Sequence, residues 1–251
     1  MGLQMKLAGK TAIVTGGSQG MGAAFAFELH ANGANVVLTD VKTKQGEAIA
    51  ADLGGRAMFI EHDVTDEDGW SRVVSETKKA FGSIDILVNN AGIVGVVSET
   101  TSLDLQTYQT ICGVNQTAVF LGMRAVIPAM REVGGGSIIN ISSIAGMLAC
   151  LGSPNLAYVA SKFAIRGMTK HVALEVAAQN IRVNSIHPGY VKTPMNEDAI
   201  RDGGEAALKV IPMHRFGQPN EVAKLVVFLA SNDSSFITGS EHIIDGGMIA
   251  G

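Results

Sequence analysis

Cysteine, proline and aromatic residues are scarce in this chain. The two cysteines, Cys112 and Cys150, lie 38 positions apart with no CxxC or Cys/His spacing, so neither a structural zinc site nor a disulfide framework is predicted. Six prolines against 30 glycines exclude a Pro-rich disordered chain, because glycine marks tight turns and close backbone approaches. We therefore expect an ordered globular protein that uses no metal.

Charge of one sign and long apolar runs are lacking as well. The net charge is -4, with acidic and basic residues mixed along the chain, so no long-range field attracts nucleic acid. No stretch approaches the roughly 20 apolar residues that cross a bilayer, and the N-terminal residues run into a glycine-rich turn rather than a signal-type apolar core. We expect a cytoplasmic protein without nucleic-acid or membrane partners.

Short β-branched runs alternate with longer helical patterns. Several runs are apolar on consecutive residues, as strands covered on both faces must be. The gaps between them are long enough for the crossover helices that join parallel strands. No repeat or charged linker marks a boundary, so residues 1–251 are expected to form one α/β domain. The predicted seven-stranded parallel sheet, with helices on both faces, uses residues 11–15, 35–40, 57–62, 84–90, 137–142, 181–186 and 241–245.

One segment, residues 194–218, interrupts this alternation. It changes from polar to apolar and stands between the sixth expected strand and a helix that begins near Asn220. Its length and mixed polarity predict a lid over a binding site, at about residues 194–211.

A glycine-rich turn joins the first expected strand to a helical pattern. Strand, glycine turn and helix form the context of a dinucleotide site, because glycines let the backbone approach a pyrophosphate and free helical N–H groups bind the anion. The alternative is an ordinary strand-to-helix turn. The residues expected to contact the cofactor here are Gly16, Ser18, Gln19, Gly20, Met21 and Gly22.

Asp40 ends the second expected strand, 18 residues after Gly22. A carboxylate there can accept hydrogen bonds from the adenosine ribose hydroxyls and would repel a 2′-phosphate. Ser18 and Gln19 add no positive charge, so the sequence favours NAD over NADP. The alternative is that Asp40 caps a helix beginning near Thr43, and both roles can hold together.

Two more segments follow expected strands at the same edge of the sheet. Asp63 and Val64 follow the third strand, where Asp63 could meet the adenine amino group or serve a turn or cap. Asn90, Ala91 and Gly92 follow the fourth strand, which in a doubly wound sheet lies across the switch point from the first. Their small side chains would let a dinucleotide approach, although the segment alone is also a plausible turn.

Tyr158 and Lys162 lie four residues apart in a helical run, so the phenol and the ammonium share one face. Tyrosine titrates at about 10, too high for efficient proton transfer at neutral pH. The lysine cation is expected to lower the phenol's pKa by Coulomb attraction, which makes Tyr158 a general acid in ketone reduction and a general base in alcohol oxidation. The alternative is an amphipathic surface pair.

Other polar residues support the chemical interpretation. Ser142 and Ser143 end the fifth strand, where ligands bind in such sheets, and a hydroxyl there can hold a substrate oxygen. Asn115 is polar among apolar neighbours in the helical stretch 104–133, which indicates either a helix-bending side-chain bond or a water-holding role. Trp70 is placed on a surface helix without function, and His187 is interpreted as a packed turn histidine.

In combination these residues resemble the short-chain dehydrogenase/reductase family, in its subgroup of chains of this size. The segment TGGSQGMG at 15–22 fits the family's TGxxxGxG, and NNAG at 89–92 fits in full. Tyr158 and Lys162 fit YxxxK, the PG turn is present at 188–189, and DGG at 245–247 fits the family's ending. The match covers essentially the whole chain and implies a single-domain, doubly wound Rossmann-type fold.

The resemblance implies a catalytic tetrad of Asn115, Ser143, Tyr158 and Lys162. Tyr158 would be the acid/base, Ser143 would orient the substrate carbonyl, and Lys162 would also hold the nicotinamide ribose. Asn115 would support a water that links Lys162 to solvent. The alignment of IINISS favours Ser143 over Ser142, and the 15-residue span from Ser143 to Tyr158 exceeds the family's common spacing, so the loop 147–156 is expected to carry an insertion.

Further contacts are also implied only by the resemblance. Asn90 would lie on the adenosine side of the cofactor, residues 194–211 would close over the substrate, and a homotetramer would form through helices 104–133 and 158–179 and the last strand. The residues implied near the nicotinamide, after the sixth strand, are Pro188, Gly189, Val191 and Thr193.

Within the family, the segments VIPAM, GGGSIINISSIAG, IRVNSIHPG and KTPM are similar to bacterial 3α,20β-hydroxysteroid dehydrogenases and related secondary-alcohol dehydrogenases. That likeness implies NAD-linked hydride transfer between a hydrophobic, bulky or cyclic secondary alcohol and its ketone. Apolar residues expected to form the pocket wall beside Ser143 and Tyr158, unless they simply pack, are Met147, Leu148, Leu151, Tyr190 and Met195.

Two alternatives remain open. An NADPH-dependent ketoacyl or carbonyl reductase would share the fold and the tetrad, but it should carry a basic residue near positions 18, 19 or 41, where this chain has Gln19 and Val41. A non-catalytic dinucleotide-binding sensor would keep the fold and lose the chemistry, and the complete tetrad argues against it.

Overall fold

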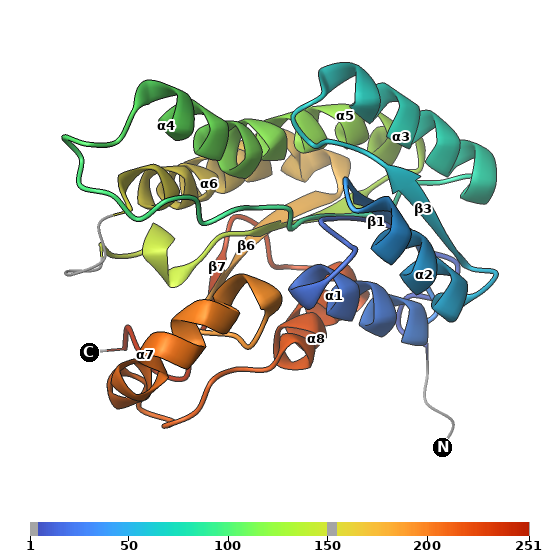
Figure 1. The fold of residues 1–251 in the computed structure, drawn as a ribbon. Coiled ribbons are helices and arrows are strands. Elements are labelled where there is room, and N and C mark those ends of the chain that lie inside the picture. Colours follow the sequence, from blue (N-terminus) through green and yellow to red (C-terminus); the bar gives the residue numbers. More distant parts are fainter. Residues whose placement is uncertain (1–4, 150–154, 251) are drawn as a thin grey trace.

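The computed structural model describes residues 5–149 and 155–250. Strands and helices alternate along the chain from β1 to β7 (Figure 1). The strands are β1 Thr11–Thr15, β2 Asn35–Asp40, β3 Ala57–Glu61, β4 Ile86–Asn89, β5 Gly136–Ile141, β6 Ile181–Pro188 and β7 Glu241–Ile244. The α-helices are α1 Gly20–Ala31, α2 Thr43–Leu53, α3 Glu67–Phe81, α4 Leu105–Cys112, α5 Ala118–Glu132, α6 Leu156–Val176, α7 Glu197–Val210 and α8 Pro219–Ala230.

All seven strands pair in parallel in one sheet of order β3-β2-β1-β4-β5-β6-β7. The predicted doubly wound fold is confirmed. Strand order reverses between β1 and β4, so the loops after these two strands lead to opposite faces and leave a crevice at the carboxyl edge. That crevice is where the sequence motifs meet.

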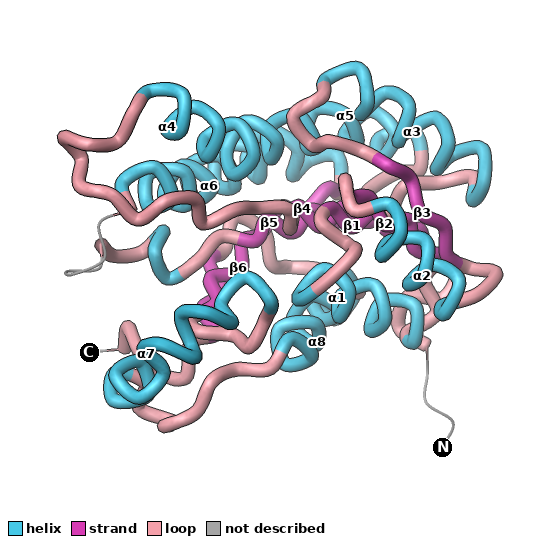
Figure 2. Tube along the Cα trace, in the orientation of Figure 1, coloured by secondary structure: helices cyan, strands magenta, loops and turns pink. Residues whose placement is uncertain are grey.

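Helices cover the sheet on both faces (Figures 1 and 2). Helices α3, α4, α5 and α6 form one layer, and α1, α2 and α8 form the other, with α7 beyond the sheet on the same side as α8 (Figure 1). Parallel strands need such crossover helices, and right-handed connections place α1 and α2 on one face and, once the strand order reverses, α5 and α6 on the other. The connection from β6 to β7 differs, because α8 packs beside α1.

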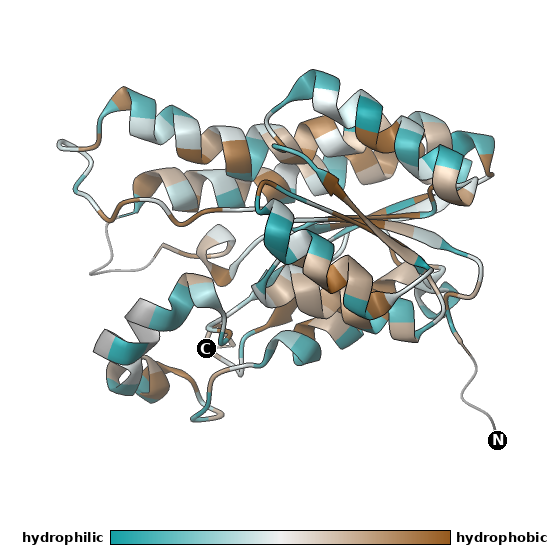
Figure 3. Ribbon diagram, turned by 45° about the vertical axis from the view of Figure 1, so that its right-hand side comes forward, coloured by the Kyte–Doolittle hydropathy of each residue, from teal (hydrophilic) through white to brown (hydrophobic). Residues whose placement is uncertain are grey.

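The strands are apolar because both of their faces are covered. Every residue of β1 is buried, and the brown strands lie at the centre of Figure 3. Alternate strand residues belong to two cores: Ile13 faces the cluster with Trp70 and Val119, whereas Val14 faces the cluster with Phe25. Consecutive apolar residues in the sequence therefore supply two cores rather than one.

The predicted strands are present with ends shifted by up to two residues. β4 begins at Ile86 rather than at 84, and β6 continues to Pro188 rather than ending at 186. The extension follows from pairing, since His187 and Pro188 align with Ile243 and Ile244 of the last strand. Strand ends depend on such partners, which a linear pattern does not specify.

Residues Leu105–Glu132 form one continuous helical region, with a π-helical turn at Gly113–Thr117 between α4 and α5. By length and composition, with a mean hydropathy of 1.2, it could cross a membrane, so the expectation that no segment is long and apolar enough is wrong. Half of the apolar window is buried inside the protein. Val119, Met123 and Val126 pack in the core against the sheet, as a core helix does.

Candidate active site

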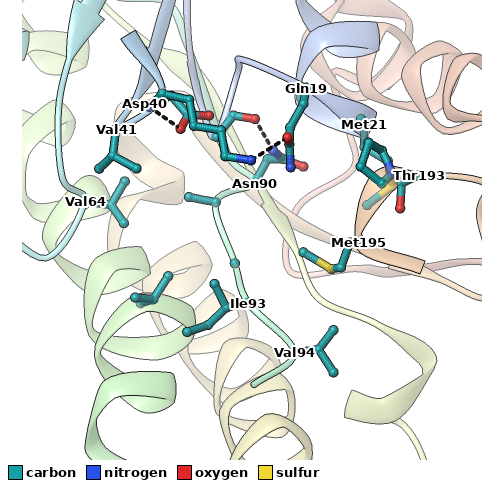
Figure 4. Close-up of a pocket in the computed structure, with 18 of the residues that line it drawn as sticks. Gln19, Met21, Asp40, Val41, Val64, Asn90, Ile93, Val94, Thr193 and Met195 are labelled. Carbon is teal, nitrogen blue, oxygen red and sulfur yellow. Dashed lines mark hydrogen bonds between the residues drawn. The ribbon is translucent and has the colours of Figure 1, made fainter. Parts of the chain in front are cut away.

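A cavity of about 530 Å³ opens at the carboxyl ends of the strands around the switch point, a size typical of a cofactor site. In Figure 4, Asp40, Val41 and Val64 lie at one end of it, and Thr193 and Met195 lie at the other. Its lining residues are Gly16, Gln19, Gly20, Met21, Gly22, Asp40, Val41, Lys42, His62, Asp63, Val64, Asn90, Ala91, Gly92, Ile93, Val94, Val114, Thr193, Pro194 and Met195.

Two positions of the glycine turn, Gly16 and Gly22, have no room for a side chain. Gly16 has φ +64°, and a Cβ there would lie 2.9 Å from the Ala91 Cα atom. A Cβ on Gly22 would lie 2.0 Å from the Gly16 carbonyl oxygen. Helix α1 then begins at Gly20 without a side-chain cap at Gln19, which leaves its first N–H groups facing the cavity region for an anion.

Asn90 braces this turn from the neighbouring strand. Its side-chain Nδ2 donates to the Thr15 and Gly16 carbonyls at 2.8 and 3.2 Å. The Thr15 hydroxyl accepts from the Asn90 and Ala91 backbone N–H groups at 2.9 and 3.0 Å. The NNAG segment therefore fixes the shape of the pyrophosphate turn, in addition to lining the cavity with Asn90, Ala91 and Gly92.

Asp40 reaches the cavity from the end of β2. Its Oδ2 accepts from the Ser18 N–H at 3.1 Å and its Oδ1 from the Lys42 N–H at 3.0 Å. The N-cap of α2 is Lys42, and no side chain caps that helix, so the alternative that Asp40 caps α2 is wrong. The Ser18 side chain is buried and Ser18 does not line the cavity, so its contribution is the backbone N–H that holds Asp40.

Lys42 is a basic residue at the cavity that the sequence reasoning missed. Its Nζ donates to the Gln19 side-chain oxygen at 2.7 Å, and both residues line the cavity beside Asp40. The sequence argument considered positions 18, 19 and 41 only. The signal was available, since Lys42 stands two residues after Asp40, where a side chain can return to the same edge of the sheet.

The segment after β3 is held by Trp70. The Trp70 indole donates to the Val64 carbonyl at 3.0 Å and is 2% exposed, so its expected place on the surface is wrong: it is the buried face of an amphipathic helix. His62 packs edge-on against it with ring centroids 4.8 Å apart, and burial lowers the pKa of His62. Asp63 lines the cavity and also makes a turn, accepting from the Thr65 N–H and hydroxyl at 2.9 and 2.7 Å.

Tyr158 and Lys162 lie in the first turns of α6, which begins with the Asn155 side chain as its cap. The Lys162 ammonium is buried, 5.6 Å from the centre of the Tyr158 ring, and donates to the Ile141 carbonyl at 3.0 Å. The Lys162 ammonium therefore lies over the face of the Tyr158 ring, and a hydrogen bond holds it to the end of β5.

Burial dominates the proton affinities of this pair. It raises the pKa of the Tyr158 phenol, and a hydrogen bond with the Ser143 side chain opposes that rise. The net result is a phenol pKa above its ordinary value, not below it as expected, because desolvation of the phenolate is the largest cause. Burial also lowers the pKa of Lys162 from 10.5 to about 8, since the ammonium has left water.

The two serines after β5 have different partners. The Ser142 hydroxyl is buried and donates to the Lys162 carbonyl at 2.9 Å. Ser143 begins a short 3-10 turn, Ile144–Gly146, and its Oγ accepts from the Ala145 N–H at 3.1 Å. Only Ser143 of the two is hydrogen bonded with Tyr158, which favours Ser143 for contact with a substrate oxygen.

Asn115 lies in the π-helical turn between α4 and α5 and is fully buried. Its Oδ1 accepts from the Ile93 N–H and its Nδ2 donates to the Ile93 carbonyl, both at 2.8 Å. Its Nδ2 also donates to the Ser161 hydroxyl at 3.2 Å. The side chain thus clamps the loop after β4 to α6, and the water-holding role implied by the resemblance stays a prediction.

The remaining predicted residues lie in different places. Thr193 and Met195 line the cavity. Pro188 ends β6, and Gly189 lies so close to Asp245 that a Cβ would be 2.8 Å from its Cα. Met147, Leu148 and Tyr190 lie outside the cavity lining with partly exposed side chains. Val191 is buried in the core below α8, and Leu151 lies outside the described residues.

The segment predicted as a lid is helical. A 3-10 turn, Pro194–Asn196, leads from Thr193 into α7, so its polar-to-apolar pattern is that of an amphipathic helix. Within residues 5–149 and 155–250, no group of three or more His, Cys, Asp or Glu side chains is placed to hold a metal ion.

Comparisons with known proteins agree with this geometry. Residues 16–249 match the family model described as Enoyl-(Acyl carrier protein) reductase. A crystal structure of a short-chain type dehydrogenase/reductase from Mycobacterium marinum superposes with a TM-score of 0.94 at 35% identity, covering 99% of this chain and 98% of that one. The chain belongs to the short-chain dehydrogenase/reductase family. It is therefore an oxidoreductase of a family that binds a nicotinamide dinucleotide.

Relatives within this family act on alcohols. The chain is 47% identical to a 3-alpha-(or 20-beta)-hydroxysteroid dehydrogenase of Mycobacterium tuberculosis, over 98% of this chain and 92% of that protein. It is 43% identical to a trans-4-hydroxycyclohexanecarboxylate dehydrogenase of Sinomonas cyclohexanicum, over 98% and 95%. It is 42% identical to an NADP-dependent (R)-specific alcohol dehydrogenase of Lentilactobacillus kefiri, over 98% of each chain.

Proposed function

We propose that the protein interconverts a hydrophobic, bulky or cyclic secondary alcohol and its ketone, with NAD as the cofactor. The observation that carries the proposal is the Tyr158 phenol, hydrogen bonded with Ser143 beside a buried Lys162 ammonium, at the carboxyl edge of a sheet that carries a dinucleotide-shaped cavity. Acid/base, substrate anchor and cation stand within one site, which is what proton transfer to a carbonyl oxygen requires.

The cavity fits a dinucleotide on its own geometry. The turn at Gly16 and Gly22 leaves no room for a Cβ, so its backbone can approach a pyrophosphate, and Asp40 stands where an adenosine ribose would lie. Thr193 lies at the nicotinamide end of the cavity. When bound, the nicotinamide ring supplies or takes up a hydride at the substrate carbon.

Tyr158, Ser143 and Lys162 carry out the proton transfer. The Tyr158 hydroxyl donates its proton to the ketone oxygen in reduction and removes it from the alcohol in oxidation. The Ser143 hydroxyl holds the same oxygen, so that the reacting carbon faces the nicotinamide end of the cavity. The Lys162 ammonium stabilises the phenolate that remains after proton donation, because an opposite charge nearby favours the charged form of the phenol in a desolvated site.

Exposed apolar side chains support a hydrophobic substrate. Met195 lines the cavity and is 46% exposed, whereas Leu148 and Tyr190, 37% and 36% exposed, lie outside its lining. Tyr190 packs edge-on against Phe216 with ring centroids 6.4 Å apart. Ligand pockets are lined mainly by apolar and aromatic side chains. Relatives with a steroid or a cyclohexane ring in their names support a bulky or cyclic alcohol.

The preference for NAD rests on the Asp40 carboxylate, which would repel a 2′-phosphate. The second candidate is an NADP-dependent enzyme, and one observation favours it: the Lys42 ammonium lies at the same end of the cavity, bonded to Gln19 at 2.7 Å. A relative at 42% identity is NADP-dependent. We favour NAD because backbone N–H groups fix both Asp40 carboxylate oxygens. The exposed Lys42 ammonium is held by the Gln19 side chain instead.

The test compares initial rates with NAD and NADP on a panel of open-chain, cyclohexyl and steroid secondary alcohols. We expect turnover of the cyclic substrates with NAD, and Asp40→Ala should shift the ratio of kcat/KM toward NADP by about 10-fold or more, the size of one lost charge repulsion. Lys42→Ala is the matched control and should shift it the other way. A wild type that prefers NADP would overturn the cofactor proposal, and a chain that binds NAD without oxidising any alcohol would favour the sensor.

We also propose a homotetramer. Leu105, Phe120 and Leu174 are 69%, 46% and 84% exposed on α4, α5 and α6, and Ile243 is 46% exposed on the edge strand β7. Apolar side chains gathered on helices and an edge strand are a cost in water that a symmetric interface removes.

A further inference from the structure

His187 is buried beneath the catalytic serine turn and has no part in the chemistry described above. It is the seventh residue of β6, and its side chain is 0% exposed. Its ring lies between two polar groups: Nδ1 is 3.1 Å from the Ser143 carbonyl oxygen, and Nε2 is 2.9 Å from the Ser185 hydroxyl. A buried imidazole with both nitrogens paired is a fixed structural connection.

The partners determine which nitrogen carries the proton. A carbonyl oxygen can only accept, so Nδ1 must carry the hydrogen that it donates to Ser143. Burial lowers the pKa of His187, which keeps the ring neutral at pH 7. In the neutral ring Nε2 is then an acceptor, and the Ser185 hydroxyl donates to it. The Ser143 carbonyl therefore selects the tautomer, and the Ser185 hydroxyl matches it by donating to Nε2.

The Ser143 carbonyl accepts from the Gly146 N–H at 2.9 Å inside its own turn, and the His187 ring is the group that ties it to the neighbouring strand, because the ladder ends just before it. The last ladder bond between β5 and β6 runs from the Ser142 N–H to the Ile186 carbonyl at 2.8 Å, and the paired residues end at Ile141 and Ile186. The His187 side chain continues the connection between the two strands by one residue. It does so at the residue whose hydroxyl meets Tyr158.

The other end of the turn is held independently. Arg166 of α6 donates to the Gly146 carbonyl at 2.9 Å, and Glu241 of β7 orients the guanidinium with two bonds at 3.0 and 3.1 Å. Both carbonyls that bracket the turn Ile144–Gly146 thus accept from side chains of distant elements. With Arg166 holding Gly146, the His187 bond controls Ser143 in particular.

We propose that His187, in its Nδ1–H form, is a positioning residue that fixes Ser143 so that its hydroxyl meets Tyr158 and the substrate oxygen. The inference deepens the proposed function and rests on it for the role of Ser143. A displacement of about 1 Å at a reacting group can cost about 100-fold in rate. His187 therefore controls kcat/KM for the alcohol and leaves cofactor binding unchanged, because it lies outside the lining of the cavity.

Protonation of His187 would keep the Nδ1–H bond to Ser143 and change only the Ser185 contact. Nε2 would become a donor, and the Ser185 hydroxyl would have to accept from it instead of donating to it. The charged groups that face the ring are Glu241 from β7, which favours the imidazolium, and Arg166 and Lys162 from α6, which oppose it. Burial and the two cations together disfavour the charged ring.

The first test observes the ring without any substrate. The ¹⁵N shifts of a histidine distinguish Nδ1–H, Nε2–H and imidazolium forms, and the His187 signals are assigned by their loss in His187→Asn. We expect a neutral Nδ1–H ring at pH 7, and Ser185→Ala should keep the Nδ1–H form, because the Ser143 carbonyl accepts only from a hydrogen on that nitrogen. An Nε2–H ring or an imidazolium at pH 7 would overturn the inference even in a fully active enzyme.

The second test separates positioning from stability. His187→Leu should lower kcat/KM for the alcohol about 10- to 100-fold, with the Kd for NAD changed by less than about 2-fold. His187→Asn keeps an N–H near the position of Nδ1 and should recover most of that loss. His242→Leu, the same substitution at the residue of β7 that aligns with Ile186, is the matched control and should leave kcat/KM unchanged.

Each outcome decides one question. Equal activity of His187→Leu and wild type would overturn the inference, as would losses in His187→Leu and His187→Asn that follow only their melting temperatures. A wild type that oxidises no alcohol would overturn the proposed function and with it the catalytic role of His187, whereas the tautomer would still be decided by ¹⁵N shifts.

Discussion

Tyr158 is the residue on which the chemistry depends. Burial raises the pKa of its phenol in the structure described, so the neutral, proton-donating form predominates at pH 7. This form suits ketone reduction directly, while alcohol oxidation needs the phenolate and hence the nearby Lys162 cation. The two directions therefore place opposite demands on one hydroxyl group.

Tyr158→Phe removes the hydroxyl and keeps the ring. We expect turnover to fall by about 10³-fold, within the range for loss of a positioned acid/base, with the melting temperature and the Kd for NAD little changed. Steady-state rates and cofactor fluorescence titration measure this. Tyr108→Phe, on α4 away from the cavity lining, is the matched control; full turnover of Tyr158→Phe would contradict the mechanism.

Lys162 serves the reaction at a cost in stability. Burial lowers its folded-state pKa from 10.5 to about 8, so the unfolded chain binds more protons between these values. The penalty is fully present below about pH 8 and disappears as the pH rises toward 10.5. A shift of this size corresponds to about 3 kcal/mol, less about 1 kcal/mol for the bond to Ile141.

Lys162→Met should therefore raise the free energy of unfolding by about 2 kcal/mol at pH 7 and abolish turnover. The gain should shrink as the pH rises from 8 toward 10.5, the window in which the wild type loses its penalty. Denaturant unfolding at several pH values measures it. Lys79→Met on the exposed side of α3 is the control, and a gain that does not depend on pH would argue against a buried ammonium.

At the scale of elements, the effect of replacing a helical glycine depends on the atoms that face it. A Cβ on Gly22 in α1 would lie 2.0 Å from the backbone oxygen of Gly16, whereas a Cβ on Gly167 in α6 would meet nothing within 4 Å. The first glycine joins α1 to the turn that binds the pyrophosphate. The second is a helix-interior position with open space.

The same substitution should therefore act in opposite directions in the two helices. Gly22→Ala should weaken NAD binding at least about 10-fold and destabilise the fold, because backbone atoms must separate. Gly167→Ala should stabilise it by about 0.5–1 kcal/mol through helix propensity. Calorimetry and NAD titration of both variants measure this, and equal behaviour would contradict the close contact at Gly16.

The helices of the catalytic face also share polar connections. The Asn115 amide ties the loop after β4 to the π-helical turn and to Ser161 of α6. Ser161 in turn donates to the Tyr158 carbonyl at 2.7 Å. The buried Asn115 side chain therefore links a wall of the cofactor cavity to the helix that carries the proposed acid/base. We expect a shift of one to shift the other.

At the scale of the whole molecule, exposed apolar side chains predict assembly. If α5 and α6 form the interface, Phe120→Asp and Leu174→Asp together should reduce the mass of the particle in light scattering from four copies to one or two. Phe27→Asp on α1, on the opposite layer and 41% exposed, should leave it unchanged. A wild type that is a monomer at micromolar concentration would contradict the proposed homotetramer.

Most of the fold follows from the sequence. Consecutive apolar residues in 11–15 and 35–40 predict strands buried on both faces, and β1 and β2 occupy these residues without change. The period of a strand, the glycine turn and the length of a crossover are local properties, so a linear pattern carries them. The same locality places Tyr158 and Lys162 on one helical face.

Other features depend on which residues meet across the fold. Trp70 is buried because α3 packs against α5, and Lys42 reaches Gln19 from another strand. The hydrogen bond between His187 and Ser143 joins residues 44 positions apart. Burial raises the pKa of Tyr158, and the spacing of residues along the chain does not reveal that burial. Burial and pairing are set by distance in space, which is why they could not be predicted from the order of residues.

The sequence by itself thus determined the parallel sheet and the glycine turn, and it singled out the residues that we propose as the acid/base and its cation. The tertiary structure decided how each group is held: which serine meets Tyr158, which nitrogen of His187 carries its hydrogen, and which charges stand beside Asp40. The physical reason is that residue types specify what chemistry is possible, whereas hydrogen bonding and desolvation, which tune that chemistry, arise only when distant segments pack together.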